Sequence, residues 1–239
     1  MLTNKLCKLI WAQMVGAFFA ASGAYAQDIT IAAIDLPGLY TPAADGIYDA
    51  AYAAASARAN ISIPMQVLPP ARAIDQFLKQ QVDCLAPMDA EFIGTDFPTV
   101  QTRPFFIARI FIFTAEGQAP LNSLAQLKGK KVGIRKGMIY GSEFDAAGLS
   151  VSVADSIESN IKKVQKGRLD AFIAYTPDAF DAFDRLGMTP LPYDSAHPVA
   201  QHQDGILCRD TPATRSFVDE MNTAIEHMET SGQLEVIVG

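Results

Sequence analysis

The sequence predicts an α/β protein of two lobes, on three observations. Strand and helix patterns alternate along residues 29–87, and the same rhythm returns over residues 108–186. Such alternation is typical of parallel sheets covered by helices. A final strand and an amphipathic helix follow, and no third lobe remains for them to complete, so we expect them to return to the first lobe. The chain then crosses between lobes near residues 105 and 203, which predicts a two-strand hinge beside a cleft.

The first lobe is expected to contain a parallel sheet covered by helices. Its strands are short apolar runs with β-branched residues, and its first helix places Tyr48, Ala51, Tyr52 and Ala55 on one face. The predicted elements are a strand at 29–34, a helix at 47–59, a strand at 63–68, a helix at 71–81 and a strand at 83–87. Residues 96–106 interrupt the pattern and are expected to form a connection.

The second lobe is expected to repeat this order. Asp155 and Glu158 indicate a helix start and Gly167 the same helix's end, while Pro177 suits the first turn of another helix. The predicted elements are strands at 108–114, 131–135, 151–153 and 170–175, with helices at 123–128, from 140, at 155–166 and after 177. A strand at 205–208 and a helix at 214–229, which Gly232 ends, then rejoin the first lobe.

The N-terminus predicts a secretory signal peptide. Lys5 and Lys8 precede an apolar run that is too short to span a bilayer comfortably, and Ala24 and Ala26 form a small-x-small cleavage site. We therefore expect residues 1–26 to be a signal peptide, residues 27–105 plus 204–239 to form lobe 1, and residues 106–203 to form lobe 2. The mature protein is expected in the periplasm.

Charge and cysteine content exclude few functions. The formal net charge of −7 disfavours nucleic acid and anionic membranes, which need a basic face. Cys84 and Cys208 fall in predicted strands and could form a disulfide, with two buried thiols as the alternative. The pattern shows no metal spacing, no phosphate loop and no catalytic triad, so we expect no cofactor. Asp89 and Glu91 form a close acid pair in a loop, where we expect them to be solvated.

A glycine turn at Gly137 is the most prominent candidate site. It joins the strand that ends at Arg135 to a helix that starts near Tyr140. The first N–H groups of a helix are unpaired and lie at its positive end, so they can bind an anion. An ordinary strand-to-helix turn is the alternative, and the stretch alone does not separate the two.

Four segments resemble family 3 extracellular solute-binding proteins, the periplasmic receptors of amino-acid ABC importers. Leu127–Gly137 resembles the family's LKGKxVGVxxG turn, and Asp155–Tyr175 resembles its dsxxealxxLxxGrvDaxxxD segment. Pro70–Ala73 and Asn222–Ile237 are similar to a helix entry and to the family's C-terminal segment. The resemblance implies a type II periplasmic-binding-protein fold that clamps a ligand between its lobes, with the Gly137 turn donating N–H groups to a ligand carboxylate.

The chain departs from this family at both charged ligand anchors. The arginine of the family's TxxR motif has no counterpart in residues 88–96, although Arg103 follows later. Tyr175 stands where the family places the aspartate that binds the ligand's ammonium, and Met138 replaces the serine or threonine after the turn glycine. An ordinary α-amino acid is therefore an uncertain ligand.

The expected ligand-binding residues come from strand ends and loops. Four of them have a structural alternative. Arg72 could lie on the surface, and Arg135 could form an ion pair with Glu143. Phe105 could pack in the core, and Asp35 could cap a loop. The candidates are Asp35, Tyr40, Arg72, Phe105, Arg135, Gly137, Met138, Tyr140 and Tyr175.

The sequence thus indicates a monomeric periplasmic solute-binding protein without catalytic activity. We expect it to close on a small, carboxylate-bearing organic ligand and to deliver that ligand to a membrane permease. Two alternatives stay open, namely an accessory or sensory protein for an oxidoreductase or sensor kinase, and a dehydratase-like enzyme on the same fold.

Overall fold

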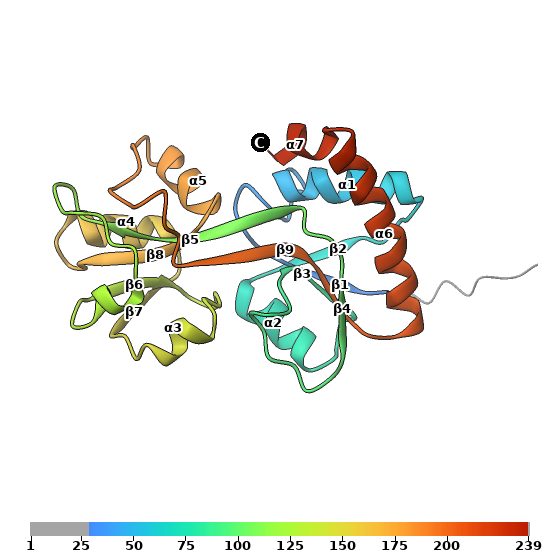
Figure 1. The fold of residues 1–239 in the computed structure, drawn as a ribbon, viewed down its shortest axis with the longest axis horizontal. Helices are drawn as coiled ribbons and strands as arrows, with labels where there is room; N and C mark the ends of the chain where they lie inside the picture. The colour runs from blue at the N-terminus through green and yellow to red at the C-terminus, as the bar shows by residue number, and fades with distance from the viewer. Residues whose placement is uncertain (1–28, 239) are drawn as a thin grey trace, which may run out of the picture.

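The computed structural model describes residues 29–238. The expected signal peptide, residues 1–26, lies outside this range. Two α/β lobes lie side by side and two long strands run between them (Figure 1). Within the described residues, no helix combines the length and the apolar character that a bilayer crossing requires.

Nine strands form the sheet of the described chain, and their order explains the two lobes. The order is β2-β1-β3-β9-β5-β8-β6-β7, with β4 paired to β9 outside this path. The strands are β1 (Ile31–Ile34), β2 (Met65–Leu68), β3 (Cys84–Met88), β4 (Thr99–Gln101), β5 (Phe106–Thr114), β6 (Val132–Arg135), β7 (Val151–Ala154), β8 (Ala171–Thr176) and β9 (Ala200–Arg209). We call the β1–β4 half lobe 1 and the β6–β8 half lobe 2.

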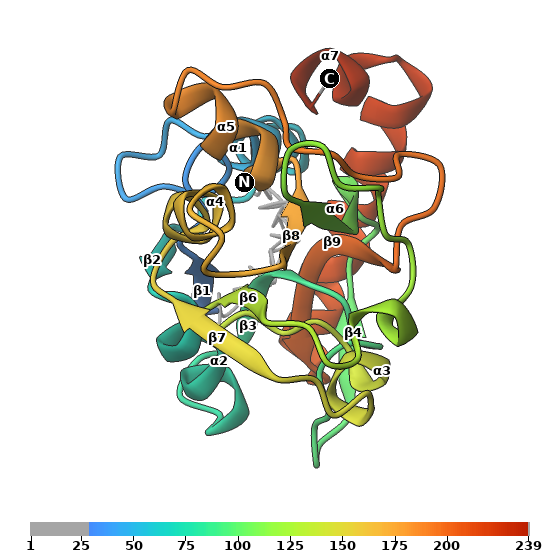
Figure 2. The same cartoon turned by 90° about the vertical axis from the view of Figure 1, so that its left-hand side faces the viewer.

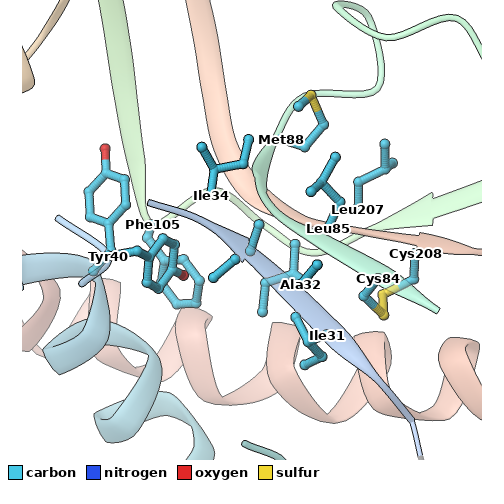
Figure 3. Close-up of a cluster of buried hydrophobic side chains, with 14 of the residues drawn as sticks. Ile31, Ala32, Ile34, Tyr40, Cys84, Leu85, Met88, Phe105, Leu207 and Cys208 are labelled. Carbon is cyan, nitrogen blue, oxygen red and sulfur yellow. A yellow bond between two sulfur atoms is a disulfide. The ribbon is translucent and has the colours of Figure 1, made fainter. Parts of the chain in front are cut away.

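Lobe 1 is built as the strand–helix alternation predicts. β1 lies between β2 and β3 and is parallel to both, and α1 and α6 lie together on one side of this sheet (Figure 1). The helices are α1 (Ile47–Ala59), α2 (Pro70–Leu78), α6 (Pro212–Thr230) and α7 (Gln233–Val238). Apolar side chains of β1, β3 and β9 fill the core between sheet and helices (Figure 3).

Lobe 2 repeats the arrangement with a different core. β6 is parallel to β7 and β8, and Figure 2 shows this lobe facing the viewer. Its helices are a 3-10 helix, η1 (Leu124–Leu127), followed by α3 (Ser142–Ala146), α4 (Ile157–Gln165) and α5 (Asp178–Arg185). Phe113 of β5, Phe172 of β8 and Phe183 of α5 are fully buried in a core that α4 shares.

The hinge consists of β5 and β9, which pair antiparallel from Phe106 opposite Asp204 to Ile110 opposite Ala200. β9 then continues into lobe 1, where it pairs with β3. The two-lobe α/β fold with a two-strand hinge is therefore confirmed. Because β9 belongs to both lobes, its middle residues lie at the floor of the space between them.

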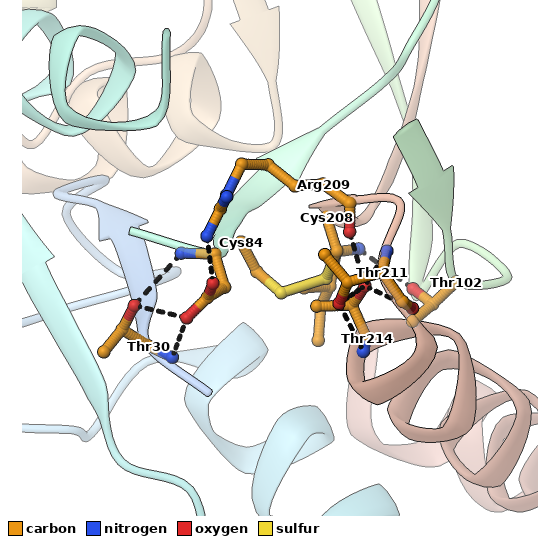
Figure 4. The surroundings of a disulfide bond; sticks show 9 residues. Thr30, Cys84, Thr102, Cys208, Arg209, Thr211 and Thr214 are labelled. Atoms are coloured by element: carbon orange, nitrogen blue, oxygen red, sulfur yellow. Dashed lines mark hydrogen bonds and ion pairs between the residues drawn. A yellow bond between two sulfur atoms is a disulfide. The ribbon is translucent and has the colours of Figure 1, made fainter. Parts of the chain in front are cut away.

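A disulfide joins Cys84 of β3 to Cys208 of β9, directly opposite each other in the antiparallel register. Figure 4 shows its surroundings: Arg209 forms an ion pair with Asp83, and Asp83 also accepts hydrogen bonds from Thr30 at 2.8 and 2.9 Å. Of the two alternatives left open by the sequence, the disulfide is the one present.

Several local predictions were wrong. β4 lies inside residues 96–106, which the pattern assigned to a connection, and α7 follows Gly232, where no helix was expected. α4 begins after Ser156, whose hydroxyl accepts from the Ser159 N–H at 3.2 Å, so Ser156 and not Asp155 caps this helix. Local sequence patterns miss such short elements, because contacts with distant parts of the chain stabilise them more than local propensity does.

Candidate functional site

A narrow cavity lies between the lobes, beside the hinge strands β5 and β9. Its volume is about 30 Å³, which is room for about two water molecules. Its walls are mostly apolar and come from both lobes and the hinge. They are Ile34, Leu36, Leu39, Ile74, Pro87 and Met88 from lobe 1, Ala108, His202 and Asp204 from the hinge, and Met138, Ile139, Tyr175, Thr176, Pro177 and Asp178 from lobe 2.

Asp178 enters this cavity from the end of β8. The strand runs to Thr176, and Pro177 starts the turn that places Asp178 in the first residues of α5. Its side chain is 4% exposed. One carboxylate oxygen, Oδ1, is buried and has no hydrogen-bond partner within the described part of the chain.

The environment of Asp178 favours its neutral form. Its pKa is raised to about 7, chiefly by burial and also by charge repulsion from Asp204, while Arg135 and backbone N–H groups at the start of α5 act in the opposite direction. An acid with this pKa is part protonated near neutral pH. Its charge therefore responds to any other charge that enters the cavity.

The hinge strand supplies a second acid that, unlike Asp178, is fully hydrogen bonded. Asp204 accepts from the Tyr48 hydroxyl at 2.5 Å, and its other oxygen lies 2.5 Å from His202 Nδ1. All three side chains are buried. Burial and the nearby Asp204 raise the pKa of Tyr48 well above its ordinary value, so Tyr48 remains a donor.

Two tyrosines of lobe 2 form one wall. The rings of Tyr140 and Tyr175 stack with centroids 5.8 Å apart, and the Tyr175 hydroxyl donates to the Ile139 carbonyl. Tyr140 accepts from the Arg135 N–H at 3.0 Å. These bonds fix the position of Tyr175, which lines the cavity, while Tyr140 is buried behind it.

Arg135 connects the lobes. Its guanidinium donates to the Asp35 carbonyl of lobe 1 at 3.0 Å, and not to Glu143. It also lines a second cavity of about 200 Å³, which shares Asp178 with the first. The remaining lining residues of this second cavity are Pro37, Asp155, Ser156, Ile157, Glu158 and Arg185.

The Gly137 turn lies against lobe 1. Gly137 has φ of +77°, and a Cβ at this position would lie 2.8 Å from the backbone nitrogen of Ala71, at the start of α2. Only glycine fits both the backbone conformation and this approach. The turn is thus a contact between the lobes, while Met138 beside it packs against the cores of both.

Four of the other candidates are not among the residues that line the narrow cavity. Tyr40 and Phe105 are buried in the lobe 1 core (Figure 3), Arg72 is exposed on α2, and Asp35 is half-buried after β1. Arg103, between β4 and β5, pairs with Glu229 of α6 at 2.6 Å, so its side chain lies against this helix of lobe 1. Met138 and Tyr175 line the narrow cavity directly, Arg135 lines the second one, and Gly137 and Tyr140 support them.

Sequence reasoning missed Asp178, His202 and Asp204. His202 and Asp204 alternate with exposed Gln201 and Gln203 on β9, and this period of two could have indicated that they share a buried face. Asp89 is also buried, accepting from the Gln203 N–H at 2.8 Å, so the prediction of a solvated acid there was wrong.

Comparison with known proteins finds likeness in structure only. No protein-family model matches the sequence, and no curated protein matches it. Among solved structures, an ancestral arginine-binding protein bound to arginine has a TM-score of 0.65 at 18% identity, covering 87% of this chain and 95% of that one. The GluR0 ligand-binding core from Nostoc punctiforme, in complex with L-glutamate, has a TM-score of 0.71 at 16% identity, covering 87% and 96%.

A histidine kinase sensor domain with similarity to periplasmic binding proteins also matches, with a TM-score of 0.67 at 16% identity, covering 88% of this chain and 94% of that one. Identities this low show a shared fold and nothing finer. The chain therefore has the periplasmic-binding-protein fold.

Proposed function

We propose that this protein is a periplasmic solute-binding protein that encloses a small organic ligand between its lobes. The observation that carries the proposal is the cavity at the hinge, walled by both lobes and containing Asp178 with an unpartnered carboxylate oxygen. Buried polar groups are normally hydrogen bonded, and an exception in a cavity suits a ligand that completes the bond.

The cavity's size implies that the lobes move apart to admit a ligand. About 30 Å³ holds little more than a small head group. Two strands connect the lobes, and proteins with hinges of this kind close around ligands by rotation of rigid halves. We propose lobe boundaries at 105/106 and 203/204, with residues 27–105 and 204–239 in lobe 1 and residues 106–203 in lobe 2. At these positions the chain passes from the apolar core of lobe 1 to those of lobe 2 and back.

We propose Arg135, Met138 and Tyr175 as ligand contacts, with Gly137 and Tyr140 shaping the site. The resemblance of Leu127–Gly137 and Asp155–Tyr175 to amino-acid receptors supports delivery to a membrane permease as a monomer. The likeness to a sensor domain of a histidine kinase supports the alternative, a sensory role for the same cleft. The chemistry in both cases is binding without catalysis.

Mass spectrometry of solute released from purified protein tests this proposal. We expect a stoichiometric small molecule, or binding of one on titration with a solute library, together with a smaller radius of gyration in solution scattering. Tyr175→Ala should weaken binding at least tenfold, while Tyr193→Ala, in the outer aromatic cluster of lobe 2, should not. A protein that binds no solute and keeps one shape would contradict it.

A further inference from the structure

We propose that the cleft recognises its ligand by an organic cation, an amine or guanidinium group held between Asp178 and the Asp204–His202 pair. This inference rests on the proposed function and specifies the ligand's chemical class. It differs from the sequence-based expectation, which placed a carboxylate at the Gly137 turn.

The charges that line the narrow cavity favour a cation. Asp178 and Asp204 are acids, and no lysine or arginine is among the residues that line this cavity. Asp204 satisfies both of its oxygens within the protein, through Tyr48 and His202. Asp178 does not, because its Oδ1 is buried without a partner in the described residues. An ammonium or guanidinium group supplies the missing donor and the opposite charge.

A carboxylate suits the same position poorly. It would enter between two acids, whose mutual repulsion already contributes to the raised pKa of Asp178 beside the larger effect of burial. The Gly137 turn, the expected anion site, is covered by the backbone of Ala71 in this structure. Its helix, α3, is also only five residues long, so the dipole behind the turn is small.

The apolar walls suit the carbon chain that carries such a cation. Leu36, Leu39 and Ile74 face Met138 and Ile139 across the cavity. A volume that holds about two water molecules also holds an ammonium head and a methylene group. The second cavity, which shares Asp178 and is lined by Arg135 and Arg185, offers room for the remainder of the ligand.

Binding of a cation should release a proton from Asp178. Several charged or titratable groups surround Asp178 and set its protonation. They are Arg135 of β6, His202 and Asp204 of β9, Tyr175 of β8, Tyr48 of α1, Asp181 and Arg185 of α5, Asp155 and Glu158 at the start of α4, and Asp89 after β3.

A cation beside Asp178 stabilises the ionised carboxylate and lowers its pKa, so the proton leaves as the ligand enters. With a pKa of about 7, a small fraction of Asp178 is ionised at pH 5.5 and most of it at pH 8. Because only the ionised fraction binds well, affinity for a cation should rise at least about tenfold over this range.

Calorimetric titration with 1,4-diaminobutane and agmatine, against butyrate and succinate, tests the inference. We expect the amines to bind and the carboxylates not to bind at pH 8. Asp178→Asn should lose at least tenfold in amine affinity, while Asp184→Asn, which removes a charge from the exposed side of α5, should change it less than twofold. Circular dichroism confirms that each variant is folded.

A second measurement uses the unaltered protein. Titrations at pH 6.5 in phosphate and in Tris, whose ionisation enthalpies differ, should show net proton release on amine binding. Binding of carboxylates alone, unchanged amine affinity in Asp178→Asn, or amine binding without proton release would overturn the inference and leave the proposed function standing. Failure of both ligand classes, with no solute released from the purified protein, would overturn both.

Discussion

The two lobes share one architecture but are stabilised differently. Lobe 1 has the Cys84–Cys208 disulfide. An ion pair between Arg209, at the end of β9, and Asp83, just before β3, joins the same two strands. Lobe 2 depends on aromatic packing and ends in an edge strand, β7, whose Val151 and Val153 are 41% and 53% exposed. From this difference we expect lobe 1 to be the more stable half and lobe 2 to unfold first.

Removing the centre of the lobe 2 core should have the largest effect. Phe113 is fully buried, and its ring lies 4.9 Å from that of Phe172 and 5.5 Å from that of Phe183. Phe113→Ala should lower the free energy of unfolding by about 3–5 kcal/mol, measured by urea denaturation. Hydrogen exchange should show lost protection in β5, β6 and β8.

Phe77→Ala is the matched control for this comparison, because Phe77 is equally buried in lobe 1. It should reduce protection in lobe 1 and leave lobe 2 unchanged. Equal loss of protection in both lobes from either variant would show that the lobes unfold as one unit and do not differ in stability.

Removal of the disulfide should weaken lobe 1 selectively. The bond closes a loop between residues 124 positions apart, and native disulfides of this kind stabilise by about 2–5 kcal/mol. Cys84→Ala with Cys208→Ala should lower stability by that amount in denaturant unfolding. Exchange in β3 should increase to the rate seen in lobe 2. A variant as stable as the native protein would mean that packing, not the cross-link, stabilises lobe 1.

Asp178 should make stability depend on pH. Its folded pKa of about 7 lies above its ordinary value of 3.8, so the folded state holds the proton more tightly than the unfolded state. The free energy of unfolding therefore falls as pH rises from about 4 to about 7, and is level above that range. Asp178→Asn should remove this loss and be more stable at pH 8, by on the order of a few kcal/mol.

Thermal unfolding at pH 5 and pH 8 measures the effect. Asp184→Asn, exposed on the same helix, is the control and should keep the native pH dependence. If the Asn variant keeps that dependence as well, another group is responsible for it.

The contact between Arg135 and Asp35 should have the smallest effect. It is one hydrogen bond of 3.0 Å from a side chain of lobe 2 to a carbonyl of lobe 1. Arg135→Gln should cost about 1 kcal/mol of stability or less, while shifting solution scattering toward a more open shape. An unchanged scattering profile would mean that Gly137 and Met138 hold the lobes together without it.

The fold was predictable because its signals are local. Apolar runs and helix faces located β1, α1 and α6 to within two residues at each end, and the chain's return to lobe 1 located the hinge. The short elements β4 and α7 were not predicted, since their stability comes from contacts with β9, α1 and α6.

The site was less predictable because it is made by burial. Asp178 follows Pro177 at what the sequence shows only as a helix start, where acids are common. The alternation along β9 could indicate that Asp204 is buried, but its hydrogen bond from Tyr48, far away in the sequence, has no local signal. That Tyr175 lines the cavity could be predicted, because it lies near the end of a strand and strand ends in α/β sheets border the cleft.

The position of β9 also constrains the order in which the chain can assemble. All of lobe 2 lies between Cys84 and Cys208 in the sequence, whereas lobe 1 needs β9, α6 and α7 to complete its core. A chain synthesised from its N-terminus can therefore finish lobe 2 while lobe 1 still lacks its last strand and helices. The half that carries the cross-link in the finished molecule is the one that must wait for the last residues of the chain.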